Sequence, residues 1–288
     1  MFSVIGVTGQ VGGVAARLLL ANGCDVRAVI RNPDKASTLR EQGYEVSLAD
    51  LRDTQALTLA FQKAEGVFVM LPLNFDPSSD FSEALEIVSS LRDAIITAQP
   101  GKVVCLSTIG AQVLQPSLLT QARYLEEALS KLPMPVAFVR AAWFMENALC
   151  DVERARESGE IPSFLQPVSR MIPMVATADI GRVISETLME EWDGLRIIEL
   201  EGDRRISPND IAETFDRLLG RQVRPKLVPR DEWEEMFRAQ GMKNPGPRMQ
   251  MLDGFNEGWL KFEGRRTETR IGRVPLDVVL RDLVRNAG

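Results

Sequence analysis

Three glycines near the start of the chain have the spacing of a phosphate-binding turn: Gly6, Gly9 and Gly12, each separated by two residues. Glycine has no Cβ, so it can take positive φ in a turn and let a diphosphate approach the backbone closely. The apolar run Phe2–Ile5 precedes the turn and a helical pattern follows it, which is the strand-turn-helix context that the motif requires. The N-terminus of that helix would direct unpaired N–H groups at the diphosphate. A glycine-rich turn without a ligand is the alternative, and the flanking elements favour nucleotide binding.

The end of the second predicted strand, 25–30, carries two cations where dinucleotide-binding folds discriminate between their cofactors. NAD sites usually place a carboxylate here for the ribose 2′-OH. This chain instead has Arg31, with Lys35 one helical turn further on. Two cations favour a 2′-phosphate and therefore NADP, although solvated surface charges, or an inward-turned Asp34, are open alternatives. Asp50, after the next strand, could accept a hydrogen bond from the adenine amino group.

Further candidates follow the fourth and fifth predicted strands. Phe75, in the run 72–75, is a candidate wall for the nicotinamide half of a dinucleotide. Thr108 or Ser107 could donate a hydrogen bond to a developing oxyanion. The chain has no histidine, which excludes His-based catalytic dyads and triads and the usual zinc sites, and no cysteine pair has metal-ligand spacing.

These residues need a parallel sheet to bring them to one edge, and the pattern predicts one. Strands and helices alternate over the first half of the chain, which indicates an α/β fold with a doubly wound parallel sheet of the Rossmann type. The predicted strands are 2–5, 25–30, 45–49, 66–71, 102–106 and 135–139, and the helices include 54–63, 82–98 and 117–132.

The pattern changes after residue 140. An aromatic-rich segment leaves the sheet, 160–173 reads as irregular, 179–191 reads as a helix and 196–200 as a strand. We predict a Rossmann domain at residues 1–149, with 175–200 packing back onto it. The smaller α/β C-terminal lobe would consist of 150–174 and 201–288.

Composition narrows the class of protein. The net charge of −6 gives no global indication of a nucleic-acid face. No run of about 18 apolar residues predicts a membrane span, and no secretory signal stands at the start. Cys24, Cys105 and Cys150 lie far apart, in or beside apolar runs, which predicts buried free thiols in a reducing cytoplasm. The oligomeric state is not readable, and a homodimer is compatible with the sequence.

The chain resembles the NmrA-like family, an atypical branch of the short-chain dehydrogenases, and within it the NAD(P)H:quinone oxidoreductase type. The resemblance covers essentially the whole length. Its most specific motif is the run Phe144-Met145-Glu146-Asn147. The remaining matches are 6–12, 29–32, Asp50, 139–140, Trp143, 178–181, 207–211, 219–221 and 269–284.

The resemblance implies an NADP(H)-binding domain and a small lobe, with the cleft for a small-molecule substrate between them. It implies that the diphosphate is held by Gly6, Thr8, Gly9, Gln10, Val11 and Gly12. It implies that Arg31 holds the 2′-phosphate, with Lys35 as the second cation suggested by position, and that Asp50 holds the adenine. Leu71 and Pro72 would lie along the ribose, and Ser107, Thr108 and Trp143 would border the nicotinamide. Phe75, Phe144, Met145 and Asn147 would line the substrate pocket.

The chain departs from the main branch of short-chain dehydrogenases in its proton donor. That branch uses a Tyr-x-x-x-Lys pair, in which the tyrosine acts as acid. The only tyrosine on the helix in question is Tyr124, and Ala128 stands where the lysine would be. Relatives within the branch keep a lysine four residues before a glutamate, and if that glutamate is Glu126, Ala122 occupies the position. We therefore interpret Tyr124 as a packing residue.

Two hypotheses about function follow. The first is an NADPH-dependent reductase of quinones or similar flat, conjugated acceptors, which can take a proton from water and need mainly orientation and proximity. The second is a dinucleotide sensor without catalysis. The absence of the Tyr-x-x-x-Lys proton donor favours this hypothesis. Arg265, Arg266, Arg270 and Arg273 could bind an anion or a partner, and four solvated arginines are the simpler interpretation.

Overall fold

An eight-stranded parallel sheet organises the molecule, whose computed structural model describes residues 1–287. The strand order is β12-β10-β6-β5-β4-β1-β2-β3. The strands are β1 (Phe2–Ile5), β2 (Val26–Ile30), β3 (Glu45–Leu48), β4 (Gly66–Met70), β5 (Val103–Thr108), β6 (Val136–Ala141), β10 (Leu195–Glu201) and β12 (Glu268–Ile271). The predicted doubly wound α/β fold is confirmed.

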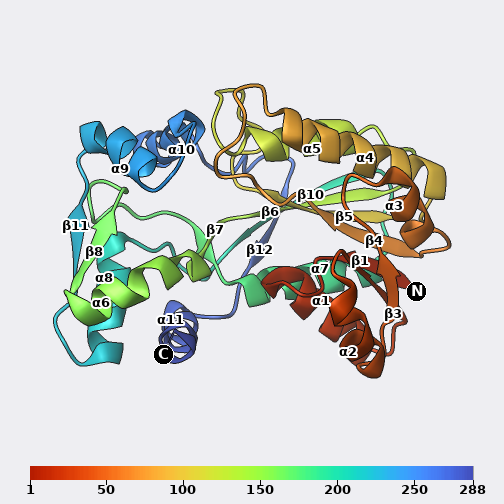
Figure 1. The fold of residues 1–288 in the computed structure, drawn as a ribbon, viewed down its shortest axis with the longest axis horizontal. Helices are drawn as coiled ribbons and strands as arrows, with labels where there is room; N and C mark the ends of the chain where they lie inside the picture. Colours follow the sequence, from red (N-terminus) through yellow and green to blue (C-terminus); the bar gives the residue numbers. More distant parts are fainter. Residues whose placement is uncertain (288) are drawn as a thin grey trace.

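Helices cover both faces of this sheet, as Figure 1 shows. On one face lie α3 (Thr54–Phe61), α4 (Ser82–Ala98) and α5 (Thr120–Leu129). On the other lie α1 (Gln10–Ala21), α2 (Ala36–Glu41) and α7 (Thr177–Met189). Because a parallel sheet is covered twice, its central strand β4 is apolar throughout. Phe68 and Val67 of β4 are fully buried against the two opposite faces.

Residues 175–200, which we expected to return to the first domain, supply α7 and β10. The strand β10 pairs with β6 in parallel, and α7 packs closely on α1. A Cβ at Gly181 would lie 2.6 Å from the Cβ of Val14 and 2.7 Å from the carbonyl oxygen of Val11, so only glycine allows this approach.

The sheet also gains β12, which pairs with β10 at its outer edge. The prediction that residues 201–288 lie wholly in the smaller lobe is wrong for this strand. Its place is fixed by long-range ion pairs that a sequence pattern does not reveal. Arg196 of β10 contacts Glu268 of β12 at 2.6 Å, and Arg270 of β12 contacts Glu190 at 2.8 Å.

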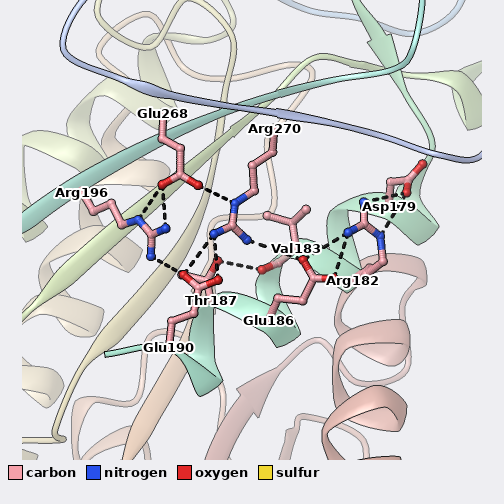
Figure 2. A network of polar contacts seen from close by, with 9 residues as sticks. All are labelled: Asp179, Arg182, Val183, Glu186, Thr187, Glu190, Arg196, Glu268 and Arg270. Atoms are coloured by element: carbon pink, nitrogen blue, oxygen red, sulfur yellow. Dashed lines mark hydrogen bonds and ion pairs between the residues drawn. The ribbon is translucent and has the colours of Figure 1, made fainter. Parts of the chain in front are cut away.

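Figure 2 shows that these pairs continue along α7 as one ladder of alternating charge. Arg270 also contacts Glu186, which in turn contacts Arg182, and Arg182 reaches Asp179 in the first turn of α7. Three elements that are distant in sequence are thereby joined. Such networks stabilise more than isolated surface pairs do, because each charge has several partners.

The smaller lobe, on the left of Figure 1, holds a two-stranded parallel sheet, β8 (Glu160–Ser163) with β11 (Arg224–Leu227). Its helices are α6 (Val152–Glu157), α8 (Pro208–Leu219), α9 (Trp233–Ala239), α10 (Gly246–Glu257) and α11 (Leu276–Asn286). The short pair β7 (Trp143–Phe144) and β9 (Met174–Val175) and the 3₁₀ segment η2 (Met145–Asp151) connect it to the sheet; η1 (Pro33–Lys35) and η3 (Arg230–Glu232) are further 3₁₀ turns. The prediction that 160–173 is wholly irregular is wrong for β8, because the partner strand lies some sixty residues later.

The ends of α8 follow from local sequence. Ser207 accepts from the backbone N–H of Asp210, whose carboxylate accepts in return from the backbone N–H of Ser207. Gly220 ends the helix in the left-handed region at φ 62°.

The three cysteines are free thiols. Cys105 is fully buried, and burial raises its pKa well above the usual value. The prediction of buried thiols is wrong for Cys150, which is exposed because it lies on the outer side of η2. Within residues 1–287 no helix is both long and apolar enough to cross a membrane.

Candidate functional site

The candidate residues converge on one edge of the sheet because parallel strands end on the same side. The chain runs outward from β1 to β3 and then returns to place β4 on the other side of β1. Ligands of open α/β sheets bind at the carboxyl ends of the strands where the order reverses. Gly6 follows β1, Arg31 follows β2 and Leu71 follows β4, in register with these ends. Thr108 ends β5 at the same edge.

The glycine turn has the geometry of a phosphate cradle. Gly6 takes φ +73°, and the N–H of Gly9 donates to its carbonyl oxygen at 2.9 Å. A Cβ at Gly12 would lie only 2.5 Å from that same oxygen, so the start of α1 rests directly on the turn. Gly9 caps α1 without a side chain over the helix end, and no acidic residue stands in the first turn.

The exposed residues of this turn are Thr8, Gly9 and Gln10. The first N–H groups of a helix have no intrahelical partner, so they are available to an anion, and the residues present fit a diphosphate. The prediction for Val11 is wrong for its side chain, which is 6% exposed and packs into the core. It can offer a ligand only its backbone.

The cations predicted to select NADP are both exposed. Arg31 follows β2, and Lys35 ends η1. Neither forms an ion pair with any residue of 1–287, so both charges are available to a ligand. Asn32 caps this turn by accepting from the backbone N–H of Asp34 at 2.9 Å.

Asp50, predicted to hold the adenine, is half-buried after β3. Its Oδ1 accepts from the backbone N–H of Arg52 at 2.9 Å, which fixes the orientation of the carboxylate. This turn leaves Oδ2 free of hydrogen bonds to the rest of the described chain.

The loop between β4 and α4 is held from two sides. Gln121 of α5 exchanges hydrogen bonds with the backbone N–H and carbonyl of Asn74, at 3.1 and 2.9 Å. Asp76 accepts from the backbone N–H groups of Lys243 and Asn244 at 2.9 and 2.7 Å, and these bonds lower its pKa. The loop thus joins the Rossmann domain to the smaller lobe, which our sequence analysis did not detect.

The residues that this loop was predicted to present differ in exposure. Leu71 is buried at 7% exposure, whereas Pro72 is exposed and Phe75 is 54% exposed at the tip. An exposed phenylalanine is available to a flat ligand. The buried Leu71 can offer a ligand only its backbone.

Ser107 is committed to a buried ionic network. Its hydroxyl donates to Oε1 of Glu126 at 2.5 Å. Arg140 donates to both oxygens of Glu126, at 2.9 and 2.7 Å, and contacts Glu263 at 2.9 Å. Burial works to lower the pKa of Arg140, but the hydrogen bonds and charges of the two glutamates outweigh it and raise that pKa.

This network shows that the prediction for Ser107 is wrong, and it brings three further residues to the site. Because the single proton of Ser107 points at Glu126, Ser107 is unsuited to donate to a substrate oxygen. The Thr108 hydroxyl, in contrast, makes no hydrogen bond within residues 1–287 and is only half-buried. Glu126, Arg140 and Glu263 were not among our candidates. Arg140 is the signal that could have found them, since a charge inside the apolar strand 136–141 needs a buried partner.

Tyr124, interpreted as a packing residue, lies edge-on to Phe81 with 6.0 Å between ring centroids. The guanidinium of Arg123 lies 5.1 Å from its ring. Both contacts are on the helix layer of α4 and α5, which agrees with that interpretation.

The segment after β6 divides between wall and core. Trp143 is half-buried and packs edge-on against Phe255 of α10, with ring centroids 5.2 Å apart. Phe144 is also half-buried and Asn147 is exposed. The prediction that Met145 lines the substrate pocket is wrong, because its side chain is 2% exposed and belongs to the core of the smaller lobe.

Met145 is buried because of the 3₁₀ period of η2. Residues three apart lie on the same side of such a helix, so Met145 and Ala148 share the buried side while Asn147 and Cys150 share the exposed one. The wall therefore consists of Trp143, Phe144 and Asn147.

Buried carboxylates hold the wall and the C-terminal segment in place. Glu146 accepts from the backbone N–H and the hydroxyl of Thr177 at 2.8 and 2.6 Å, and burial raises its pKa. Glu199 accepts from the backbone N–H groups of residues 263 and 264, and Asp179 from those of 273 and 274.

The C-terminal arginines behave differently from one another. Arg265, Arg266 and Arg273 are exposed, as the simpler interpretation predicted. Arg270 is not solvated, because it belongs to the ion ladder of Figure 2.

Comparisons with known proteins agree with this geometry. A model of the NmrA-like family matches residues 2–245. The chain is 25% identical over 261 residues to the NAD(P)H azoreductase of Xenophilus azovorans, covering 89% of this chain and 85% of the relative. It is 23% identical over 245 residues to quinone oxidoreductase 2 of Escherichia coli (strain K12), covering 84% and 82%.

The fold matches that of solved structures over its full length. It aligns with the Escherichia coli NADPH-dependent quinone oxidoreductase QOR2 complexed with NADPH at a TM-score of 0.81, with 21% identity and 100% of both chains covered. At 21% identity, this structural similarity shows that the two proteins share a fold. Since the family model covers most of the sequence, the chain belongs to the NmrA-like family.

Proposed function

We propose that the protein is an NADPH-dependent oxidoreductase that reduces quinone-like or other conjugated small molecules. The observation that carries the proposal is the position of the glycine cradle, the unpaired Thr108 hydroxyl and the Trp143 wall along one edge of the sheet. The names of the relatives support the same class: one is an NAD(P)H azoreductase and one a quinone oxidoreductase.

The cofactor half of this site would bind through backbone groups and cations. The turn from Gly6 to Gly12 holds the diphosphate, and Arg31 with Lys35 neutralises the 2′-phosphate. Asp50 accepts from the adenine amino group. NADPH bound in this way supplies a hydride to an electron-poor acceptor.

The protein's own contribution to the reaction is orientation and one hydrogen bond. Trp143 and Phe144 hold a flat acceptor against the cofactor site, and Phe75 covers it from the β4 loop. The Thr108 hydroxyl donates to the acceptor oxygen on which negative charge develops. Water then protonates that oxygen, so the absent Tyr-x-x-x-Lys pair is not required for a conjugated acceptor.

A nucleotide sensor without catalysis is the second candidate. The observation that favours it is the same absence: within residues 1–287, Tyr124 packs on Phe81 and no lysine follows it on α5. Such a protein would bind the reduced and oxidised nucleotides unequally and change conformation with them.

Titration of the protein with NADPH and NADH by fluorescence, followed by a panel of quinones, separates the two. Tight NADPH binding with quinone-dependent oxidation supports the reductase. Tight binding without oxidation of any acceptor supports the sensor, and binding of neither nucleotide refutes both.

The Thr108→Val variant tests the hydrogen bond at the acceptor oxygen. We expect kcat to fall about 30- to 150-fold, since one oxyanion donor stabilises the transition state by about 2–3 kcal/mol. NADPH affinity should stay unchanged. Ser107→Ala is the comparison, because the Ser107 hydroxyl donates to Glu126 instead. Its loss should lower the free energy of unfolding and change kcat little.

A further inference from the structure

Arg248, in the first turn of α10, differs from every other shielded arginine of the molecule. Ten arginines of residues 1–287 are buried or half-buried. Seven of them contact carboxylates: Arg27, Arg92, Arg123, Arg140, Arg182, Arg196 and Arg270. Arg156 and Arg170 donate to backbone carbonyl oxygens. Arg248 alone has no oxygen acceptor within the described chain.

The contacts of Arg248 hold its side chain in place without neutralising it. Its guanidinium lies 4.3 Å from the ring centroid of Phe237 in α9, which is fully buried. One nitrogen, Nη1, donates to Sδ of Met242 at 3.6 Å, which is a weak acceptor. A guanidinium has five N–H donors in one plane, so stacking on a ring leaves the edge of the fork free to bind.

The electrostatic balance around Arg248 is unusual in the same way. Burial lowers its pKa, and no carboxylate among residues 1–287 opposes this effect. For Arg140, in contrast, Glu126 and Glu263 outweigh the effect of burial. The site at Arg248 therefore has a positive charge and lacks the anion that would compensate it.

Arg248 lies on the substrate side of the smaller lobe. Phe255, which packs against Trp143, stands seven residues later on the same helix. Seven residues are two turns, so both side chains share one face of α10 and are separated by about 10 Å along the axis. The start of α10 is tied to the segment after Thr108, since Leu118 donates to the carbonyl oxygen of Pro247 at 2.8 Å.

The exposed side of η2 reaches the same place. Cys150, which lies near Arg248, shares that side with Asn147 of the proposed substrate wall. Trp143, Phe255 and Arg248 thus follow one another along this side of the smaller lobe, in which α9 and α10 lie beside each other (Figure 1).

We propose that Arg248 binds an anionic substituent, a carboxylate or a sulfonate, on the aromatic substrate of this protein. This inference rests on the proposed function, because it takes the acceptor to lie against Trp143. The preferred substrate is then a conjugated molecule whose aromatic part lies against Trp143 and whose anionic substituent reaches Arg248. The planar fork of Arg248 suits both anions, which accept two parallel hydrogen bonds.

Paired acceptors that differ in charge test this proposal. The probes are 1,4-naphthoquinone-2-sulfonate and the neutral 2-methyl-1,4-naphthoquinone, each with NADPH. In Arg248→Met we expect the KM of the sulfonated quinone to rise at least about tenfold, as for the loss of a charge-assisted hydrogen bond. The kcat should change little, and the KM of the neutral quinone should stay within about twofold.

Two further variants separate recognition from folding. Arg248→Lys keeps the charge and should recover part of the affinity for the sulfonated quinone. Arg230→Met is the matched control, because Arg230 also stacks on an aromatic ring of α9, Trp233, but is paired with Asp253. It should leave both quinones unaffected. Equal losses for the charged and the neutral quinone in Arg248→Met would overturn the proposal.

A binding measurement keeps the inference independent of turnover. By calorimetry, naphthalene-2-sulfonate should bind the wild-type protein at least about tenfold more tightly than 2-naphthol, and Arg248→Met should abolish that difference. If no quinone is reduced but this preference exists, the proposed reductase fails and the anion site stands. If quinones are reduced but no preference exists, the anion site fails and the reductase stands.

Discussion

The glycine turn after β1 and the aromatic wall after β6 lie at the same edge of one sheet, but they depend on different parts of the chain. The turn is complete within residues 6–12 and offers mainly backbone groups. The wall comes from β7 and η2 and is flanked by side chains of α10 and the β4 loop, so the segments involved lie up to about 180 residues apart. Buried Glu146 holds the wall by accepting from the backbone N–H and the hydroxyl of Thr177.

This difference indicates how each half fails. A backbone cradle tolerates no added Cβ at its close contact, but it does not depend on remote charges. A side-chain wall accepts many local substitutions, yet it loses its shape when a buried clamp is removed. The cofactor half and the acceptor half of one site should therefore respond separately to mutation.

The largest effect should come from the buried ionic network of Arg140 with Glu126 and Glu263. Arg140→Met leaves Glu126 buried without its partner and should lower the free energy of unfolding by about 3–5 kcal/mol. Urea denaturation measures this loss. Adding Glu126→Gln should restore part of the stability, whereas Glu263→Gln, whose side chain is 40% exposed, should cost no more than about 1 kcal/mol. A stable Arg140→Met protein would refute the role given to this network.

The cradle should break at Gly12. The Cβ of Gly12→Ala would lie 2.5 Å from the carbonyl oxygen of Gly6, so the turn must shift. We expect a loss of about 2–3 kcal/mol in stability and about a hundredfold weaker NADPH binding, measured by fluorescence titration. Gly246→Ala is the control, since its Cβ meets nothing closer than 3.7 Å. Equal effects of the two substitutions would show that close contact is not the reason.

A third variant tests the choice of nucleotide. Arg31→Ala removes a cation that has no protein partner among residues 1–287, so stability should change little. NADPH binding should weaken about 30-fold, as for the loss of a charge-assisted hydrogen bond, and NADH binding should not change. Arg40→Ala, also exposed, is the matched control in α2. If both nucleotides weaken equally, Arg31 does not bind the 2′-phosphate.

The smallest effect concerns Asp151, at the end of η2. Burial raises its pKa from 3.8 to about 7. Between these values the native state binds a proton that the unfolded state does not, so the free energy of unfolding falls as pH rises from about 4 to 7 and stays low above. Asp151→Asn should stabilise the protein by about 1–2 kcal/mol at pH 8 and have little effect at pH 4. Thermal denaturation at the two pH values measures it, and a gain at both would contradict this explanation.

Local patterns predicted the Rossmann elements well, because each needs only its own residues. The helix predicted at 82–98 has the observed bounds. The helix predicted from residue 54 begins there, where Asp53 caps α3 by accepting from the N–H of Ala56. The glycine turn could be identified for the same reason. Predictions failed where strand pairing is long-range, as for β8 and β12. The prediction for Met145 failed because the 3₁₀ period of η2 turns its side chain into the core.

The sequence by itself determined the fold class, the family resemblance and the residues of the phosphate turn, since periodicity, glycine spacing and helix caps act over a few residues. Only the tertiary structure decided that Ser107 points at Glu126 while Thr108 stays free, and that Arg248 has no oxygen acceptor. These facts depend on which side chains meet across long chain separations. Burial then makes each such meeting, or its absence, count strongly in free energy.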